Sequence, residues 1–357
     1  MLSQTNIRVL TVDDSLVFKQ LFHTNLPQIN SSISIIGHAL NAQDALLKIK
    51  TLQPDVVTLD IEMPGMSGIE LTKLVMKECP TPIILVSSLN ISVFDALSYG
   101  AIDFVRKPDL NNHDNSVKFL NTLARKIVIG YHSKKNIKTT SMSATRRLQG
   151  LTNNTLPISL RTSANLNSKV IAIGASTGGT EAILEVIKDL PLHTPGIVIT
   201  QHMPAGFTKM YAERLNKICK ISVKEAQNGD PIRPGTALLA PGGFQMKVVR
   251  NHMGLSVTCQ RGANVSGHCP SVDVLFTSMA EQIKSDGIGI ILTGMGRDGA
   301  AGMLKMHQAG AYTIGQNKES CVVYGMPMEA YKLGAVDIEA PCSQIPSVLL
   351  KRLNQGF

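Results

Sequence analysis

The first third of the chain alternates short apolar runs, rich in β-branched residues, with stretches of helical periodicity. The apolar runs have the length of buried strands, and the stretches between them, such as Gln43–Leu52 and Gly68–Lys77, place apolar residues on one helix face. Strands that alternate with helices predict a parallel sheet with helices on both faces. The predicted strands are Ile7–Val12, Ile33–Gly37, Val56–Asp60, Ile83–Ser87 and Ile102–Val105.

The same pattern restarts abruptly near residue 168. Strands are predicted over Lys169–Gly174, Gly196–Thr200 and Gly287–Leu292, with helices over Gly178–Leu190 and after Gly299. This order predicts a second, doubly wound parallel α/β domain. Three apolar runs in its middle predict a β-hairpin insertion, and these runs are Thr236–Ala240, Gln245–Arg250 and Leu255–Thr258.

Between the two α/β regions the periodicity disappears. A last amphipathic helix is predicted over about Asn115–Ile129, and the stretch from Gly130 to Ser168 is rich in Ser, Thr, Asn, Lys and Arg with neither apolar period. We therefore expect an α/β domain over residues 5–128, a basic flexible linker over residues 129–167, and a second α/β domain over residues 168–355.

Composition places the chain among folded proteins, because 43% of its 357 residues are hydrophobic. Its formal net charge of +9 comes from one window, since no Asp or Glu lies between Asn115 and Thr180. Outside this window 25 Lys and Arg face 26 Asp and Glu, so the two predicted domains are together almost neutral. The basic residues of the window are Lys118, Arg125, Lys126, Lys134, Lys135, Lys138, Arg146, Arg147, Arg161 and Lys169.

The cysteines and the N-terminus indicate a cellular compartment. Six cysteines are scattered without a CxxC pair or a zinc-like cluster, which is typical of reduced thiols in a cytosol. The N-terminus lacks the pattern of a signal peptide, and no apolar stretch approaches the ~20 residues that a membrane span needs. We therefore expect a soluble, cytoplasmic protein.

Polar side chains stand at or just past the ends of the predicted strands of the first domain. They are Asp13, Asp14, Asp60, Ser87 and Lys107. Because the carboxyl ends of parallel strands meet at one edge of a sheet, these side chains are expected to share a crevice. Carboxylates that lie so close need a compensating cation, and Mg²⁺ prefers oxygen ligands. A carboxylate between Mg²⁺ and a lysine is suited to attack a phosphoryl group.

A glycine-rich turn opens the second domain, where residues 174–179 read GASTGG. Small residues at a strand-to-helix turn can hold a phosphate on the helix N-terminus, whereas a G-x-S-x-G pattern presents Ser176 as a nucleophile. The Walker pattern fails because no Lys follows the glycines. The dinucleotide interpretation expects an acidic residue at the end of the next strand, where this chain instead has Gln201 and His202.

Three residues of the second domain could form a catalytic triad, because each follows the end of a predicted parallel strand. In this arrangement His202 accepts the proton of Ser176, and Asp298 fixes the imidazole tautomer. Backbone N–H groups of the turn at Gly294–Gly296 could hold an oxyanion. The order Ser, His, Asp along the chain differs from that of α/β-hydrolases and disfavours ordinary esterase ancestry. From spacing alone, the hydrolase and phosphate-binding interpretations both stay open.

The first domain resembles the receiver domain of two-component response regulators over roughly residues 5–128. The residues that carry the resemblance read VDDS, LDIEMPGMSG, VSS and FVRKP. The resemblance implies that Asp60 accepts a phosphoryl group, that Lys107 supports it, and that Ser87 bonds the phosphate and couples to Phe104. It further implies a Mg²⁺ site with these ligands: Asp14, Asp60, the Glu62 carbonyl and, through water, Asp13.

The second domain resembles the catalytic domain of the chemotaxis methylesterase (CheB) family over about residues 168–350. The matching motifs read GASTGG, QHMP, APGG, TGMGRDGA and YGMP. The resemblance implies Ser176 as nucleophile, His202 as base and Asp298 as orienting acid. It also implies that the Met295 N–H lies in the oxyanion hole and that Thr177 and Met203 line the site.

The order receiver, linker, esterase domain is that of the CheB family, so the resemblance also implies function. It implies hydrolysis of γ-glutamyl methyl esters on chemoreceptors, deamidation of glutamines, no cofactor for the esterase, and phosphorylation by the chemotaxis histidine kinase. The unphosphorylated receiver is expected to cover the triad. The alternative is a receiver-coupled regulator that binds nucleic acid or nucleotide through the basic linker and the glycine-rich loop. No recognition-helix pattern supports it, so we expect no specific nucleic acid partner and only peripheral association with membrane receptor arrays.

Overall fold

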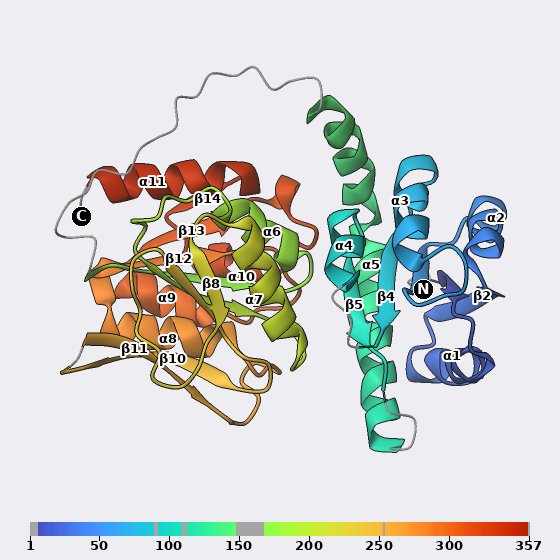
Figure 1. Cartoon of the computed structure of the whole chain (residues 1–357), viewed down its shortest axis with the longest axis horizontal. Coiled ribbons are helices and arrows are strands. Elements are labelled where there is room, and N and C mark those ends of the chain that lie inside the picture. Colours follow the sequence, from blue (N-terminus) through green and yellow to red (C-terminus); the bar gives the residue numbers. More distant parts are fainter. Residues whose placement is uncertain (1–5, 89–91, 109–112, 148–167, 253, 356–357) are drawn as a thin grey trace. The chain divides into compact units, whose positions relative to one another are not determined.

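The computed structural model describes residues 6–88, 92–108, 113–147, 168–252 and 254–355, and for 113–114 and 135–147 it describes the helix only. The chain divides into two compact units, Met1–Asn153 and Asn154–Phe357 (Figure 1). The stretch 148–167, the second half of the predicted linker, lies outside the described residues.

The first unit is built on a five-stranded parallel sheet in the order β2–β1–β3–β4–β5. Its strands are β1 Ile7–Val12, β2 Ile33–Ala39, β3 Val56–Asp60, β4 Ile83–Ser87 and β5 Asp103–Arg106. Its helices are α1 Leu16–Ile29, α2 Ala42–Leu52, α3 Gly68–Glu78, α4 Ser92–Ser98 and α5 His113–Arg147. The winding reverses between β1 and β3, and the crevice at such a switch point is where open α/β sheets bind ligands.

Helix α3 begins close to the sheet because of two local features. Ser67 and Glu70 form a capping box that satisfies the first backbone donors of the helix. Gly68 is required by its neighbour, since a Cβ at this position would lie 2.3 Å from the backbone oxygen of Asp60. The helix can therefore start directly against the end of β3.

Helix α5 is longer than predicted, because it continues past Ile129 to Arg147. The predicted helix end was wrong, and the first half of the predicted linker is helical. Gly130 lies inside the helix and is buried, and a Cβ at this position would lie 3.4 Å from Val56 and 3.5 Å from Ile84 in the sheet. The next turn is also attached to the first unit, since Lys134 Nζ lies 2.7 Å from Asp55 Oδ1.

The second unit is built on a seven-stranded sheet in the order β14–β13–β12–β6–β7–β9–β8, and all six pairings are parallel. Its strands are β6 Val170–Ala175, β7 Gly196–Gln201, β8 Ser222–Glu225, β9 Thr236–Leu239, β12 Gly287–Ile291, β13 Tyr312–Gln316 and β14 Ile338–Ala340. Its helices are α6 Gly179–Ile187, α7 Phe207–Ile218, α8 Val272–Gln282, α9 Ala300–Gln308, α10 Met326–Lys332 and α11 Ile345–Gln355. Strand β6 lies between β7 and β12, so the switch point of this sheet is at β6.

The predicted hairpin insertion is only partly right. An antiparallel hairpin does form from β10 (Gln245–Asn251) and β11 (Gly254–Gln260). The run at Thr236, however, is β9, which pairs in parallel with β7 and β8 inside the main sheet. An apolar run of strand length does not itself specify its partner, and here the buried face of β9 completes the large sheet.

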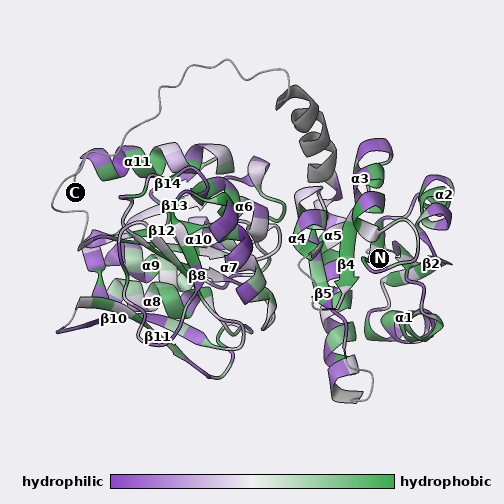
Figure 2. Ribbon diagram, in the orientation of Figure 1, coloured by the Kyte–Doolittle hydropathy of each residue, from purple (hydrophilic) through white to green (hydrophobic). Residues whose placement is uncertain are grey.

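Helices cover both faces of the second sheet. Helices α6 and α11 contact each other on one side, and α8 and α9 contact each other on the other side (Figure 1). The core on the α8 side combines sheet residues such as Ala172 and Leu238 with Phe276 and Met279 of α8 and Val248 of the hairpin. Figure 2 shows the hydropathy of each residue, with hydrophobic strands inside and hydrophilic positions on the outer faces of the helices.

Candidate active site

The turn after β6 places Ser176 at the switch point of the second sheet. The Ser176 backbone N–H donates to Thr293 O at 3.0 Å, which ties this turn to the turn after β12. Gly178 adopts φ +77° at the start of α6, a conformation that favours glycine. Gly294 must also be small, since a Cβ there would lie 2.7 Å from Ser176 Cβ. Ser176 is half-buried.

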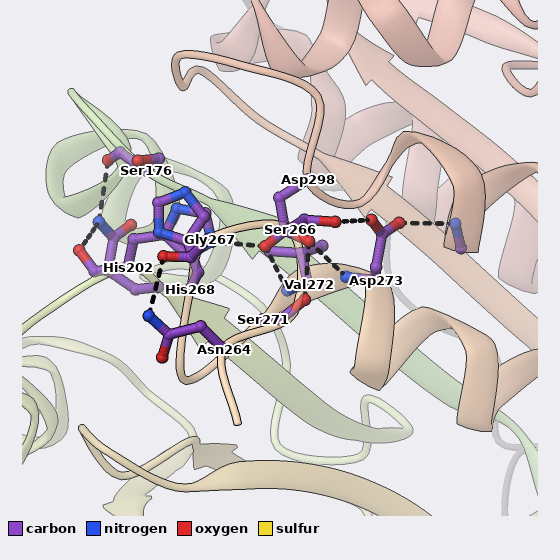
Figure 3. A network of polar contacts seen from close by, with 12 residues as sticks. Ser176, His202, Asn264, Ser266, Gly267, His268, Ser271, Val272, Asp273 and Asp298 are labelled. Carbon is purple, nitrogen blue, oxygen red and sulfur yellow. Dashed lines mark hydrogen bonds and ion pairs between the residues drawn. The ribbon is translucent and has the colours of Figure 1, made fainter. Parts of the chain in front are cut away.

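His202 follows β7, and its backbone N–H donates to Ala175 O at 3.1 Å. Its Nε2 lies 2.7 Å from Asp298 Oδ2 (Figure 3). A carboxylate only accepts, so the neutral imidazole carries its proton on Nε2 and keeps a lone pair on Nδ1. Among the residues that the structure describes, Nδ1 is buried and has no hydrogen-bond partner. Nδ1 is therefore the nitrogen left to accept a proton.

Asp298 is held by the N-terminus of α8 as well as by His202. Its carboxylate accepts from Ser271 Oγ at 2.7 Å, from the Val272 N–H at 2.8 Å and from the Asp273 N–H at 3.0 Å. Burial by itself would raise the pKa of Asp298, but His202 and these donors lower it to about 2. The side chain is 1% exposed, so it is a fixed negative charge that orients the imidazole.

The structure pairs His202 with Asp298 and places Ser176 on the neighbouring turn, next to Ala175, whose carbonyl accepts from the His202 N–H. Two further residues contact this group, and neither has a role predicted from the sequence. Gln201 Nε2 donates to Ser176 O at 2.9 Å and to His202 O at 3.3 Å, which ties the two backbones together. His268 stacks on His202 with ring centroids 3.6 Å apart and an interplanar angle of 8° (Figure 3). Gln201 was recognisable by its place beside His202, whereas His268 stands on a distant loop and carried no local signal.

The other residues predicted to line the site lie on the same turns. Thr177 and Met203 are buried, and the Thr177 carbonyl accepts from Thr293 Oγ1 at 3.0 Å. Met295 follows Gly294 in the turn after β12, and its side chain is exposed. Because Gly294 packs against Ser176 and Met295 is the next residue, the Met295 N–H stays a candidate for the oxyanion hole.

The crevice of the first unit gathers three carboxylates. Oxygens of Asp13, Asp14 and Asp60 all lie within 4.8 Å of one another. Lys107 Nζ lies 2.5 Å from Asp60 Oδ2 and 3.0 Å from Asp13 Oδ2. Burial raises the pKa of Asp60, and Lys107 only partly opposes this. The ion pairs outweigh the effect of burial on Lys107, so its pKa is raised as well.

Two predicted switch residues lie on the neighbouring strands β4 and β5. Ser87 is the last residue of β4. Within the described part of the chain, its Oγ is buried and has no hydrogen-bond partner. Phe104 is buried, with its ring centroid 6.2 Å from that of Phe94 and Lys126 Nζ 5.6 Å from its own ring. Ser87 follows Val86, the residue that pairs with Asp60 across the sheet, and a phosphoryl group could satisfy an orphaned hydroxyl at this position.

Glu62 is exposed at the mouth of the same crevice. Its backbone N–H donates to Asp60 Oδ1 at 3.1 Å, and its Oε2 accepts from Ser88 Oγ at 2.5 Å. Carboxylate oxygens from Asp13, Asp14 and Asp60 are the hard ligands that Mg²⁺ takes in proteins. The donor set therefore fits the predicted divalent cation.

Comparisons with known proteins match both units. The family described as CheB methylesterase matches residues 171–349, and the response regulator receiver domain matches residues 9–117. A protein-glutamate methylesterase/protein-glutamine glutaminase 2 of Syntrophomonas wolfei is 47% identical over 354 residues, 98% of either chain. A protein of the same name, without the number, from Salmonella typhimurium is 43% identical over 99% of this chain and 98% of its own.

A solved structure matches the second unit. The Thermotoga maritima CheB methylesterase catalytic domain superposes with a TM-score of 0.50 at 38% identity, covering 51% of this chain and 97% of its own. Fold and comparisons together define a receiver domain followed by a hydrolase domain. The chain belongs to the CheB methylesterase family. Among the residues that the structure describes, no helix combines the length and apolar character that a bilayer crossing requires.

Proposed function

We propose that this chain is a phosphorylation-activated serine hydrolase that removes methyl groups from γ-glutamyl methyl esters of chemoreceptors and deamidates their glutamines. The observation that carries the proposal is the hydrogen bond from His202 Nε2 to the buried Asp298, which leaves Nδ1 as the basic nitrogen at the switch point that also holds Ser176. The names of the related proteins from Syntrophomonas wolfei and Salmonella typhimurium supply the substrate class.

The chemistry follows from these positions. Ser176 Oγ attacks the ester carbonyl while His202 Nδ1 takes its proton, and Asp298 stabilises the imidazolium that forms. The proton then passes to the methoxy oxygen, so the C–O bond breaks and methanol leaves an acyl-Ser176. Water loses a proton to His202 and attacks the acyl carbonyl, which releases glutamate and restores the hydroxyl.

The oxyanion of each tetrahedral intermediate needs donors on the side of the turn after β12. The Met295 N–H is the proposed donor, because Gly294 packs directly against Ser176. Thr177 and Met203 are proposed to shape the wall of the site. Deamidation uses the same steps, with ammonia in place of methanol as the leaving group.

The first unit is proposed to switch the esterase on. Asp60 would accept a phosphoryl group from the chemotaxis histidine kinase, and Lys107 and Ser87 would bind its oxygens. A Mg²⁺ ion held by Asp13, Asp14, Asp60 and the Glu62 carbonyl would neutralise charge on the transferring group. The raised pKa of Asp60 supports this assignment, because a further cation stabilises a buried carboxylate that Lys107 compensates only in part. We propose that the unphosphorylated receiver restrains the esterase.

Methanol release from methylated receptor membranes tests both parts. Ser176→Ala should abolish methanol release. Phosphorylation of Asp60 by a small-molecule phosphodonor should remain unchanged in this variant. Asp60→Asn should keep basal release and lose its stimulation by the phosphodonor. Release that persists in Ser176→Ala contradicts the nucleophile, and stimulation that persists in Asp60→Asn contradicts the acceptor.

The alternative of a nucleic-acid-binding regulator gains no support from the described part of the basic window. Lys126 pairs with Asp103 at 2.6 Å, and Lys134 pairs with Asp55 at 2.7 Å. Both lysines therefore hold α5 on its own sheet.

A further inference from the structure

A second histidine lies against the proposed base. The rings of His268 and His202 are nearly parallel, at 8°, and their centroids lie 3.6 Å apart, which is van der Waals contact over the whole ring (Figure 3). His268 stands on the loop between β11 and α8, whose preceding residues are exposed. The stacking contact therefore places an exposed loop against the proposed base.

Hydrogen bonds hold the loop in place on both sides of His268. Gln245 is buried at the start of β10, and its Nε2 donates to the carbonyls of Ala263 and His268, each at 3.1 Å. Ser266 adds a second anchor, since its Oγ donates to Asp273 Oδ2 at 2.8 Å. The backbone on both sides of the His268 ring is thus tied to α8 and β10.

The same anchors lead back to the triad. Gln245 Oε1 accepts from the Ser271 N–H at 2.9 Å, and Ser271 Oγ donates to Asp298 at 2.7 Å. Asp298 holds His202, and His202 stacks on His268, whose carbonyl accepts from Gln245. These contacts form a closed circuit around the imidazole. We call the circuit the histidine clamp, and its members are His202, Asp298, Ser271, Gln245 and His268.

One hydrogen bond at Nε2 does not fix the plane of an imidazole, because the ring can still tilt about the line through that bond. A flat group in contact with one face blocks the tilt and keeps water off that face. Proton transfer from Ser176 to Nδ1 depends on the direction of the Nδ1 lone pair, so a tilted ring is a poorer base.

We propose that His268 is a positioning residue of the esterase, which sets the plane of His202 by stacking so that Nδ1 faces Ser176. The inference rests on the proposed hydrolase function. Its essential feature is a flat ring, because the face of His202 contacts the face of His268.

Two substitutions separate the ring from its polar atoms. His268→Phe keeps a flat ring without imidazole nitrogens, and His268→Gln keeps a polar side chain without a ring. Methanol release by the phosphorylated full chain should stay within about threefold of wild type in His268→Phe and fall about tenfold in His268→Gln, which is the range of an aromatic pair. His252→Gln is the matched control, because His252 is exposed in the β10–β11 hairpin. It should leave the rate unchanged.

A spectroscopic readout tests the geometry without turnover. The ring current of a stacked neighbour shifts the His202 ring protons, so their NMR shifts should move in His268→Gln and stay near wild type in His268→Phe. Thermal unfolding of each variant checks that the domain is folded. Equal rates for Gln and wild type, or equal losses for Phe and Gln in folded proteins, would overturn the proposal. Absence of methanol release by wild type would instead contradict the proposed function.

Discussion

Asp60 and Asp298 are both buried aspartates at the switch point of a parallel sheet, and their surroundings shift them in opposite directions. Asp298 has His202 and three donors at the start of α8, and its pKa falls to about 2. Burial raises the pKa of Asp60, Lys107 only partly opposes this, and the nearby Asp13 carboxylate adds to the rise. The place in the fold is equivalent, whereas the number of donors differs.

The difference in surroundings makes Asp298 a permanent negative charge, whereas Asp60 is suited to bind a cation or to be phosphorylated. Four hydrogen bonds keep Asp298 ionised and fixed, as a group that orients a histidine must be. Asp60 accepts from Lys107 and from the Glu62 N–H, and its pKa is still raised. Such a carboxylate is stabilised by a group that brings positive charge or removes negative charge, such as a metal ion or esterification by phosphate. The variants below are designed to reverse or grade this contrast.

The largest effect is expected from Asp298→Asn. An amide can donate as well as accept, so Asn at this position no longer fixes the proton of His202 on Nε2. The wrong tautomer is then populated, and methanol release should fall by about 10³-fold or more. Phosphorylation of Asp60 by a small-molecule phosphodonor should be unchanged, because it uses the other unit. A parallel loss of phosphorylation would mean that the two sites are not separate.

Acid unfolding should show the opposite pKa shifts as a stability difference. The pKa of Asp298 is about 2 in the folded chain against 3.8 ordinarily, so its ionised form stabilises the fold at higher pH. This contribution of about 2 kcal/mol should be lost as the pH falls from about 4 to about 2. The ionised form of Asp60 has the opposite effect on stability, because its raised pKa means that the charge is unfavourable in the folded chain. Urea unfolding of the catalytic domain at graded pH measures the loss, which should be missing in Asp298→Asn; an unchanged slope in that variant would contradict the assignment.

Lys107→Met should make the acidic crevice more receptive to a divalent cation. Lys107 Nζ occupies the position between Asp60 and Asp13, so removing its charge leaves these carboxylates without their compensating cation. We expect Mg²⁺ to bind about tenfold more tightly, by calorimetric titration of the full chain. Lys126→Met is the control, because Lys126 pairs with Asp103 on the edge strand. Weaker binding in Lys107→Met would show that Lys107 organises the ligands rather than competing with the ion.

The smallest effect is expected from Ser271→Ala, which removes one of the four hydrogen bonds to Asp298. The backbone donors of Val272 and Asp273 remain, so the free energy of unfolding should fall by about 1 kcal/mol and methanol release by severalfold. Ser266→Ala provides a comparison in the same loop region, because its hydroxyl donates to Asp273 rather than to Asp298. A loss in Ser271→Ala as large as in Asp298→Asn would show that the donors act as a single unit.

The strands and the polar residues at their ends could largely be predicted from the sequence. Strands β3 and β4 begin and end where the apolar runs predict, and Asp13, Asp60 and Ser176 stand at strand ends. Buried parallel strands are nearly continuous apolar runs, so their ends are sharp and the polar residues that follow are easily located. The motifs then gave the family, which the comparisons confirm.

Other features needed the folded chain. The end of α5 differs from the prediction because the helix continues through the buried Gly130 to Lys134, which pairs with Asp55 of the first unit, and no local pattern reveals such a distant contact. Strand β9 was assigned to the hairpin because its run does not name the strands with which it pairs. The charged edge strand β8 (Ser222–Glu225) has too little apolar character to be predicted at all.

The sequence by itself determined which polar side chains follow the carboxyl ends of strands, because the ends of apolar runs and the positions of motifs are local properties of the chain. Only the tertiary structure decided what each carboxylate meets there. The donors to Asp298 come from the start of α8, and the ring over His202 comes from the loop before it. These residues are far from their partners along the chain, and hydrogen bonds and stacking over such separations depend on packing rather than on periodicity. The opposite pKa shifts of Asp60 and Asp298 follow from that packing.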